Sequence, residues 1–172
     1  ADVSTSNEVF ISSLHNSRLI KGYTDVDDRF APLVVFAKEW AGAAGVKDPI
    51  HRRFNSYTVT LLVIHFLQCG MTSPVLPNLQ GLHPCLFAVS EKSFPARIDF
   101  QEPFPEPGIP ELRYRNELNV AELFFCFISY YKEDECTVPP QHMHNEVYIE
   151  DPIDEHNPGR TVDDWRAVQN CF

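Results

Sequence analysis

The 172-residue sequence is poor in basic side chains, with 14 lysines and arginines against 24 aspartates and glutamates. The formal net charge of −10 argues against a protein that holds long nucleic acid by bulk charge, because neutralising phosphates requires Lys and Arg. A local basic groove or a metal-dependent phosphate site is still compatible with this balance. Glycine is also scarce, at seven residues against 14 prolines, which predicts many stiff connections.

Cysteine is sparse, and no Cys-x-x-Cys pair occurs. The odd number and wide spacing of the five cysteines predict reduced thiols in a cytoplasmic or nuclear protein. A zinc site is the weaker interpretation, because only Cys136, His142 and His144 lie close together as candidate ligands.

Long apolar runs are missing too. The longest, near 60–67, is interrupted by His65 and is too short to span a bilayer, so we expect no membrane partner. No signal peptide is visible, and the sequence opens on Ala1, so we expect it to begin inside a fold. No internal repeat is evident.

The 44% of hydrophobic residues is sufficient for one core, and the apolar spacing predicts mostly helix. Four helices are expected, over about 7–23, 25–44, 55–68 and 119–132. Pro32 predicts a kink or restart in the second, and Gly45 should end it. Asn55 or Ser56 can cap the third, which is apolar most of the way round and should be buried. Leu123, Phe124, Phe127 and Tyr130 should turn the fourth towards the core.

The remaining segments are less regular. Residues 71–116 hold eight of the prolines, and no regular structure is predicted there. A short strand is expected at 146–150, followed by a last helix capped by Thr161 or Asp163 that continues to the chain end. The pattern alone predicts a soluble, mostly helical domain with a little strand.

Four stretches, in order, resemble one family, the template-independent RNA nucleotidyltransferases. This family comprises terminal uridylyltransferases and cytoplasmic poly(A) polymerases. The stretches are ADVSTSNEVFISSLHNSRLI from residue 1, DDRFAPLVVFAKEWA from 27, FNSYTVTLLVIHFLQ from 54, with SPVLPNLQ after it, and IEDPIDEHNPGRTV from 149. They correspond to the turn and helix after the third catalytic carboxylate, an Asp-x-Arg…Lys-x-Trp-Ala helix, an Asn-Ser-Tyr helix, and a closing acidic loop.

The resemblance implies an α+β, predominantly α fold. Residues 1–24 would end the palm-like catalytic domain, and residues 25–172 would form the helical central, PAP-associated domain with a Pro-rich insertion at about 81–115. Asp2 would be the one catalytic carboxylate and metal ligand present. No Gly-Ser motif occurs, and Asp25 and Asp27 follow Asp2 rather than precede it. Because two-metal phosphoryl transfer needs three carboxylates, we expect the isolated chain to be inactive.

The same resemblance assigns a nucleotide site. Asn16, with Ser17, would bind the ribose hydroxyl, and Lys38 would bind the triphosphate as a point charge on a flexible stem. Where the family often carries a second lysine four residues on, this sequence has Gly42, and Lys47 could compensate from the following loop. Each of these residues has a structural alternative, as a polar or charged position on a helix surface.

In the Asn-Ser-Tyr motif, Ser56 would hold phosphate and Tyr57 would stack on the base, since an aromatic ring accepts any nucleobase. The alternative for this pair is a capping serine followed by a core tyrosine.

The acidic loop would read the base. Asp151 and Asp154 would shape the pocket edge, partly through water, and His156 would face uracil. An imidazole donates to the uracil carbonyl but not to the adenine amino group, and neighbouring acids favour its charged form. Poly(A) polymerases commonly lack this histidine. The spacing between Pro152 and His156 is one residue shorter than in the usual loop of the family. Arg160 is predicted to have a structural role, pairing with the acids of this loop.

These features favour an RNA uridylyltransferase that adds UMP from UTP to RNA 3′ ends with Mg²⁺ or Mn²⁺. It would be a cytoplasmic or nuclear protein whose protein partners the sequence does not identify. One alternative is a cytoplasmic poly(A) polymerase that adds AMP from ATP. The alternative of another class is a non-catalytic helical scaffold.

Overall fold

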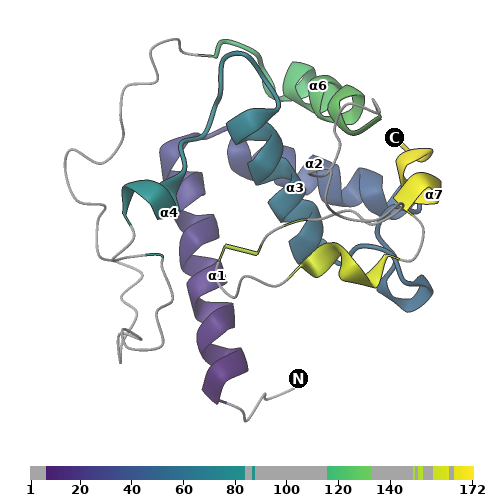
Figure 1. Ribbon diagram of the computed structural model, residues 1–172. Helices are drawn as coiled ribbons and strands as arrows, with labels where there is room; N and C mark the ends of the chain where they lie inside the picture. The colour runs from purple at the N-terminus through teal and green to yellow at the C-terminus, as the bar shows by residue number, and fades with distance from the viewer. Residues whose placement is uncertain are drawn as a thin grey trace.

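The computed structural model describes residues 7–83, 87, 116–132, 149, 151–152, 157–162 and 165–172, with the side chains of 7–12 and 161 outside the description. This part of the chain is helical, as predicted, and Figure 1 shows the helices gathered into a bundle with α1 along one side. The one β-bridge among the described residues joins Lys47 to Phe54. The strand predicted at 146–150 lies almost entirely outside the described residues. No described helix is long and apolar enough to cross a membrane.

Helix α1 (Asn7–Val26) follows the predicted helix and continues three residues further. The domain boundary predicted after residue 24 falls inside this helix. The division into two domains stays a prediction. Tyr23 is fully buried at its carboxyl end, where its hydroxyl donates to Gln80 at 3.1 Å and accepts from Gln68 at 2.8 Å. Burial raises the pKa of Tyr23 to about 12. This hydroxyl therefore fixes α1 against the helices that carry the two glutamines.

Helix α2 (Phe30–Ala43) starts later than predicted, and Pro32 does not kink it. Pro32 lies in the first turn, where a backbone N–H has no partner within the helix, so the ring costs no hydrogen bond. The break falls at Asp27–Arg29 instead. Gly45 follows the helix with a φ of +75°, the left-handed conformation expected for a terminating glycine.

Helix α3 (Ser56–Cys69) is the buried centre of the bundle, as predicted. Asn55 is its cap, since the Asn55 side chain accepts from the backbone N–H of Thr58 at 2.9 Å. Gly70 ends it, and a Cβ there would lie 2.5 Å from the ring of Phe66, so no larger residue fits without a shift. The fully buried members of α3 include Val63, Phe66 and Leu67.

Helix α6 (Val120–Lys132) packs against α2 and α3. Its start forms a capping box: Asn119 accepts from the N–H of Glu122 at 3.0 Å, and Glu122 accepts from the N–H of Asn119 at 2.8 Å. Leu123 and Phe127 face the core as predicted. Phe124 and Tyr130 are partly buried against the core, also as predicted, whereas the neighbouring Tyr131 is buried and donates to the Leu62 carbonyl at 2.9 Å, which the pattern did not predict.

Four short elements complete the described chain. Helix α4 (Leu79–Leu82), capped by Asn78, contradicts the prediction of no regular structure in the Pro-rich stretch. The 3₁₀ turn η1 (Pro49–His51) lies in the loop between α2 and α3, and η2 (Pro158–Thr161) precedes the last helix. Helix α7 (Trp165–Gln169) ends before Phe172, so the chain end does not cut it off as predicted.

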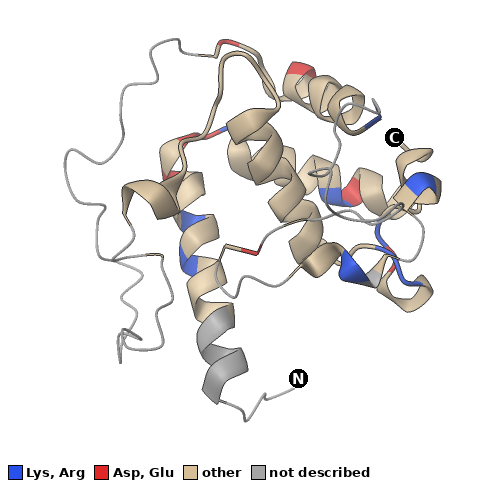
Figure 2. Ribbon diagram, in the orientation of Figure 1, with Lys and Arg blue, Asp and Glu red and all other residues tan. Residues whose placement is uncertain are grey.

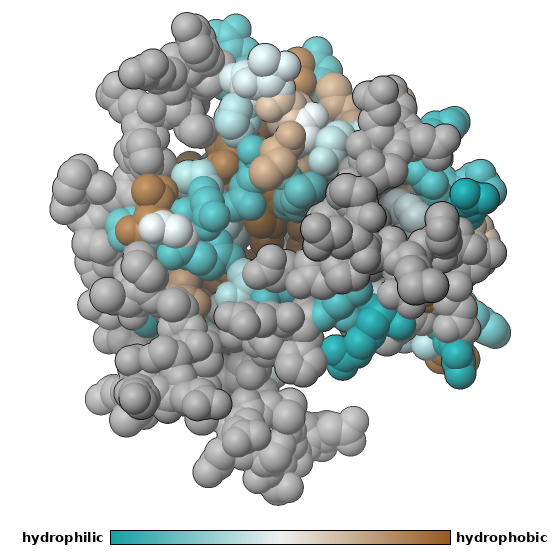
Figure 3. Space-filling model, in the orientation of Figure 1, coloured by the Kyte–Doolittle hydropathy of each residue, from teal (hydrophilic) through white to brown (hydrophobic). Residues whose placement is uncertain are grey.

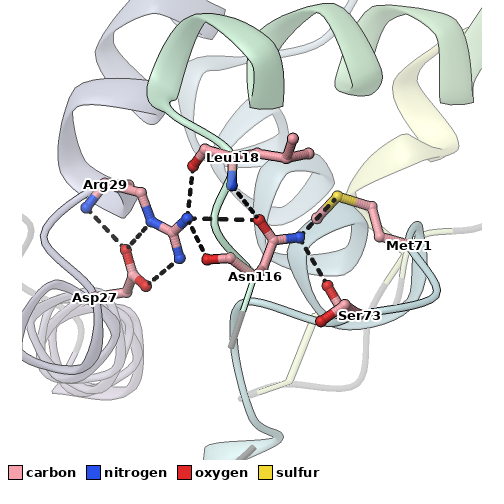
Figure 4. A network of polar contacts seen from close by, with 6 residues as sticks. All are labelled: Asp27, Arg29, Met71, Ser73, Asn116 and Leu118. Atoms are coloured by element: carbon pink, nitrogen blue, oxygen red, sulfur yellow. Dashed lines mark hydrogen bonds and ion pairs between the residues drawn. The ribbon is translucent and has the colours of Figure 1, made fainter. Parts of the chain in front are cut away.

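Arg29 connects segments that are distant in sequence (Figure 4). Its guanidinium pairs with both carboxylate oxygens of Asp27 and donates to the carbonyls of Asn116 at 2.9 Å and Leu118 at 2.6 Å. The Asn116 amide in turn donates to the Ser73 carbonyl at 2.9 Å. This network fixes the start of α2 to the segment before α6, and it engages Asp27 in a structural ion pair.

Candidate functional site

Lys38 on α2 and Lys47 in the loop after α2 lie in the same region of the molecule. Both lysines are half-buried. Burial, followed by the positive charge of Lys47, lowers the pKa of Lys38. Lys47 lies over Gly42: a Cβ built on that glycine would be 3.5 Å from Lys47 Cε and 3.7 Å from Nζ. The loop lysine therefore occupies the space beside α2 that a side chain at position 42 would enter.

Backbone contacts place this pair beside the start of α3. The N–H of Lys47 donates to the Ala41 carbonyl at 2.8 Å, and the N–H of Phe54 donates to the Val46 carbonyl at 3.2 Å. The bridge between Lys47 and Phe54 brings the loop within two residues of Ser56. Ser56 is exposed at the first position of α3. Lys38, Lys47 and the Asn-Ser-Tyr motif thus belong to one region of the surface.

Tyr57 joins this region to the acidic loop. Its ring is half-buried against the core, and its hydroxyl donates to Asp151 Oδ1 at 3.2 Å across 94 positions of sequence. Asp151 is only 5% exposed. The Asp151 carboxylate therefore holds the Tyr57 ring, a contact that the sequence did not predict although it had selected both residues.

Asn157 closes the base of the acidic loop, and sequence reasoning assigned it no role beyond a turn. Its side-chain oxygen accepts from the N–H of Ile149 at 3.0 Å and from the N–H of Gly159 at 2.8 Å. The two ends of the segment 149–157 are thereby fixed together. An Asn-Pro-Gly sequence after an acidic run is the signal that could have indicated it, since Asn accepts from backbone N–H groups in such turns.

Asn16 and Ser17 lie in the middle of α1. The Asn16 Oδ1 atom is buried and has no hydrogen-bond partner among the described residues, which is unusual for a buried amide oxygen. Ser17 is exposed, and its hydroxyl donates to the Ser13 carbonyl at 2.9 Å within the helix. The Asn16 oxygen is thus buried without a described partner, whereas the Ser17 hydroxyl is satisfied within its own helix.

Several predicted residues lie outside the described part of the chain: Asp2, Asp154, His156, the candidate zinc ligands around Cys136, and the acids beside His156. Within the described residues no group of three His, Cys, Asp or Glu side chains could hold a metal ion. Asp25 pairs with Lys21 and Asp27 with Arg29, which agrees with their exclusion as catalytic carboxylates. Arg160 is exposed and forms no ion pair with Asp151, so its partnership with the other loop acids stays a prediction.

The charge distribution is uneven over the described residues. Figure 2 shows basic residues in the loop between α2 and α3 and on α7, although the whole chain is acidic. Figure 3 shows a hollow at the centre of the same face, in the region where Figure 1 draws α1 and α3, with hydrophobic atoms at its floor and hydrophilic atoms on its rim.

Comparison with known proteins shows which family the chain belongs to. The chain is 31% identical over 130 residues to poly(A) RNA polymerase GLD2-B of Xenopus laevis, covering 76% of this chain and 24% of the relative. It is 44% identical over 87 residues to poly(A) RNA polymerase gld-2 of Caenorhabditis elegans, covering 51% of this chain and 8% of the relative. The chain therefore spans a quarter or less of the length of these curated relatives. No protein-family model matches it.

Solved structures agree with the fold. The GLD-2–GLD-3 non-canonical poly(A) polymerase complex superposes with a TM-score of 0.61 at 29% identity, covering 91% of this chain and 44% of that chain. A cytoplasmic RNA terminal U-transferase superposes with a TM-score of 0.64 at 22% identity, covering 91% and 54%. The chain belongs to the template-independent RNA nucleotidyltransferase family, as its four motifs predicted.

Proposed function

We propose that this chain forms part of an RNA nucleotidyltransferase that adds AMP from ATP to RNA 3′ ends. The observation that carries the proposal is its similarity to poly(A) RNA polymerases, which reaches 44% identity over the segment shared with the nematode relative. The U-transferase neighbour is 22% identical and supports the fold alone. This similarity favours ATP over UTP, the substrate expected from His156.

The candidate site residues support such a role because their side chains suit the phosphates, the base and the ribose of a nucleotide. Lys38 would bind the polyphosphate, and Ser56 would assist from the start of α3. The Tyr57 ring would stack on the base, with Asp151 holding its hydroxyl. The unpartnered acceptor of Asn16 suits a ribose hydroxyl, which can donate a hydrogen bond.

Metal binding would depend on residues outside the described set. Asp2 would be a ligand for Mg²⁺ or Mn²⁺, together with carboxylates from another part of the complete protein. The bound metals would activate the primer hydroxyl and neutralise the triphosphate. The described residues contain no carboxylate cluster that fits such a site, so their contribution is to bind and orient the nucleotide.

Uridylyl transfer is the second candidate, favoured by the presence of His156 in the closing loop. A non-catalytic scaffold is the candidate of another class. The GLD-2 neighbour is held in a complex with GLD-3, which supports a protein partner for the complete protein as well.

The test uses the complete protein, a 5′-labelled RNA primer with a free 3′-hydroxyl, and each of ATP, UTP, CTP or GTP with Mg²⁺ or Mn²⁺. We expect extension that is fastest with ATP. Faster extension with UTP would replace the proposal by the uridylyl alternative. No extension by a folded protein with any nucleotide would favour the scaffold. A variant carrying Asp2→Ala is the matched control, since it should abolish extension and retain the fold.

A further inference from the structure

Lys38 and Lys47 form a cationic pair that no described acid neutralises. The ion pairs among the described residues are Lys21–Asp25, Arg29–Asp27 and His51–Asp48, and neither lysine of the pair takes part in one. This arrangement is unusual in a chain with 24 acidic residues. Two half-buried ammonium groups repel each other, so their proximity is stabilised when an anion binds between them.

The position of Lys47 is fixed by its backbone rather than by a partner for its ammonium group. The Lys47 N–H donates to the Ala41 carbonyl at 2.8 Å, and the bridge to Phe54 holds the residue from the other side. The side chain then runs over Gly42, which is one helical turn after Lys38. Residues four positions apart share a helix face, so the Lys47 side chain and Lys38 lie along the same face of α2.

We infer that Lys47 is a second polyphosphate-binding residue, delivered from the loop after α2 to the helix face that Gly42 leaves open beside Lys38. The ligand class is the polyphosphate of a nucleoside triphosphate, and the inference rests on the proposed function. Its physical basis is that a polyanion can bridge two ammonium groups, whereas a nucleoside monophosphate offers too few charges to need both. Gly42 is necessary to this arrangement because a long side chain there would compete with Lys47 for the same space.

Lys47 could instead serve only as packing, with its methylene stem covering Gly42. Lys47→Met distinguishes the two roles, because it keeps an unbranched apolar side chain of similar length and removes the charge. A packing role predicts that this variant binds every nucleotide as the parent does. A polyphosphate-binding role predicts a loss confined to nucleotides with a long phosphate chain.

The experiment measures the affinities of the complete protein for ATP and for AMP, both with Mg²⁺, by calorimetric titration. For Lys47→Met we expect the Kd for ATP to rise by about tenfold or more, the range for losing one hydrogen bond to a charged group, and the Kd for AMP to stay within about twofold. Lys21→Met is the matched control. It removes an exposed helical lysine that pairs with Asp25, and it should change neither Kd.

A rescue variant tests the position as well as the charge. Gly42→Lys combined with Lys47→Met returns an ammonium group to the same face of α2 from the helix itself, and it should recover most of the lost ATP affinity. Gly42→Ala combined with Lys47→Met controls for helix propensity and should not recover it.

The outcomes separate this inference from the proposed function. A parent protein that binds no ATP would overturn the proposed function. Three results would overturn the role of Lys47 while leaving the proposed function in place. These are an unchanged Kd for ATP in Lys47→Met, equal losses for ATP and AMP, and a loss that Gly42→Lys does not restore.

Discussion

The hydrogen bond between Tyr57 and Asp151 offers a direct test of how the acidic loop meets the nucleotide site. Tyr57→Phe removes only the hydroxyl that donates to the buried Asp151 carboxylate at 3.2 Å. Hydrogen bonds to charged groups contribute about 1.5–3 kcal/mol, and the length of this one places it near the lower end, at roughly 1–2 kcal/mol. If this energy positions the base-binding ring, kcat/KM for ATP should fall by about fivefold to thirtyfold.

The aromatic ring itself should matter more than its hydroxyl. Tyr57→Ala removes the stacking face too, and base–aromatic stacking contributes about 1–3 kcal/mol, so kcat/KM should fall by a further fivefold to a hundredfold or more. The assay is primer extension by the complete protein at several ATP concentrations, with folding checked by circular dichroism. Tyr130→Phe is the matched control, because it removes the hydroxyl of an α6 tyrosine that contacts His65 in the second half of α3, away from Tyr57.

A double-mutant cycle decides whether the contact itself is responsible. Tyr57→Phe and Asp151→Ala should be less than additive when combined, with a coupling energy of about 1–2 kcal/mol, because each variant already removes the same hydrogen bond. Strict additivity within about 0.3–0.5 kcal/mol would refute the reasoning, since it would show that the two side chains act independently. An unaffected kcat/KM in Tyr57→Ala would remove Tyr57 from the base-binding role.

Three further predictions concern other parts of the chain. Arg29→Met should lower the free energy of unfolding by about 2–4 kcal/mol, because it removes the guanidinium that pairs with Asp27 and donates to two backbone carbonyls. The Tm of the complete protein checks this against Arg18→Met, and an unchanged Tm would contradict it. Burial and Lys47 lower the pKa of Lys38, so Lys38 loses its charge at a lower pH than an exposed lysine. The affinity for ATP should therefore fall as the pH rises towards the ordinary lysine range, and a profile unchanged by Lys38→Arg would exclude this lysine. His156→Asn should shift the UTP:ATP ratio of kcat/KM towards ATP by about tenfold if His156 contacts the base, and an unchanged ratio would exclude it.

The helices were predictable because their apolar residues repeat with helical spacing. Helix α3 is apolar most of the way round and is the buried centre, and Asn55 and Asn119 cap α3 and α6 through side-chain oxygens. The pattern missed one core residue on α6. Tyr130 and Tyr131 are adjacent and chemically identical, and only the contact of Tyr131 with Leu62 makes it the more deeply buried of the two.

The start of α2 depended on long-range contacts rather than on proline. The helix begins after Asp27 and Arg29 because Asp27 accepts from the backbone and guanidinium of Arg29, which reaches across 87 positions to Asn116. No local pattern in the sequence specifies that partner. The same limit applies to the site, since the motifs selected Tyr57 and Asp151 separately and their contact across 94 positions follows only from the fold.

The choice of nucleotide cannot follow from the helical bundle alone. A poly(A) polymerase and a U-transferase superpose on this chain almost equally well, with TM-scores of 0.61 and 0.64. A scaffold shared by both activities positions phosphate and ribose in the same way for either base, so discrimination must come from side chains at the base edge. The proposed base-reading residues of this chain lie in sequence between Asp151 and Asn157, and the Asn157 side chain accepts from the N–H of Ile149 before them. Substitutions between Asp151 and Asn157 should therefore change the UTP:ATP ratio without a matching loss of polyphosphate affinity, whereas substitutions at Lys38 and Lys47 should weaken both nucleotides alike.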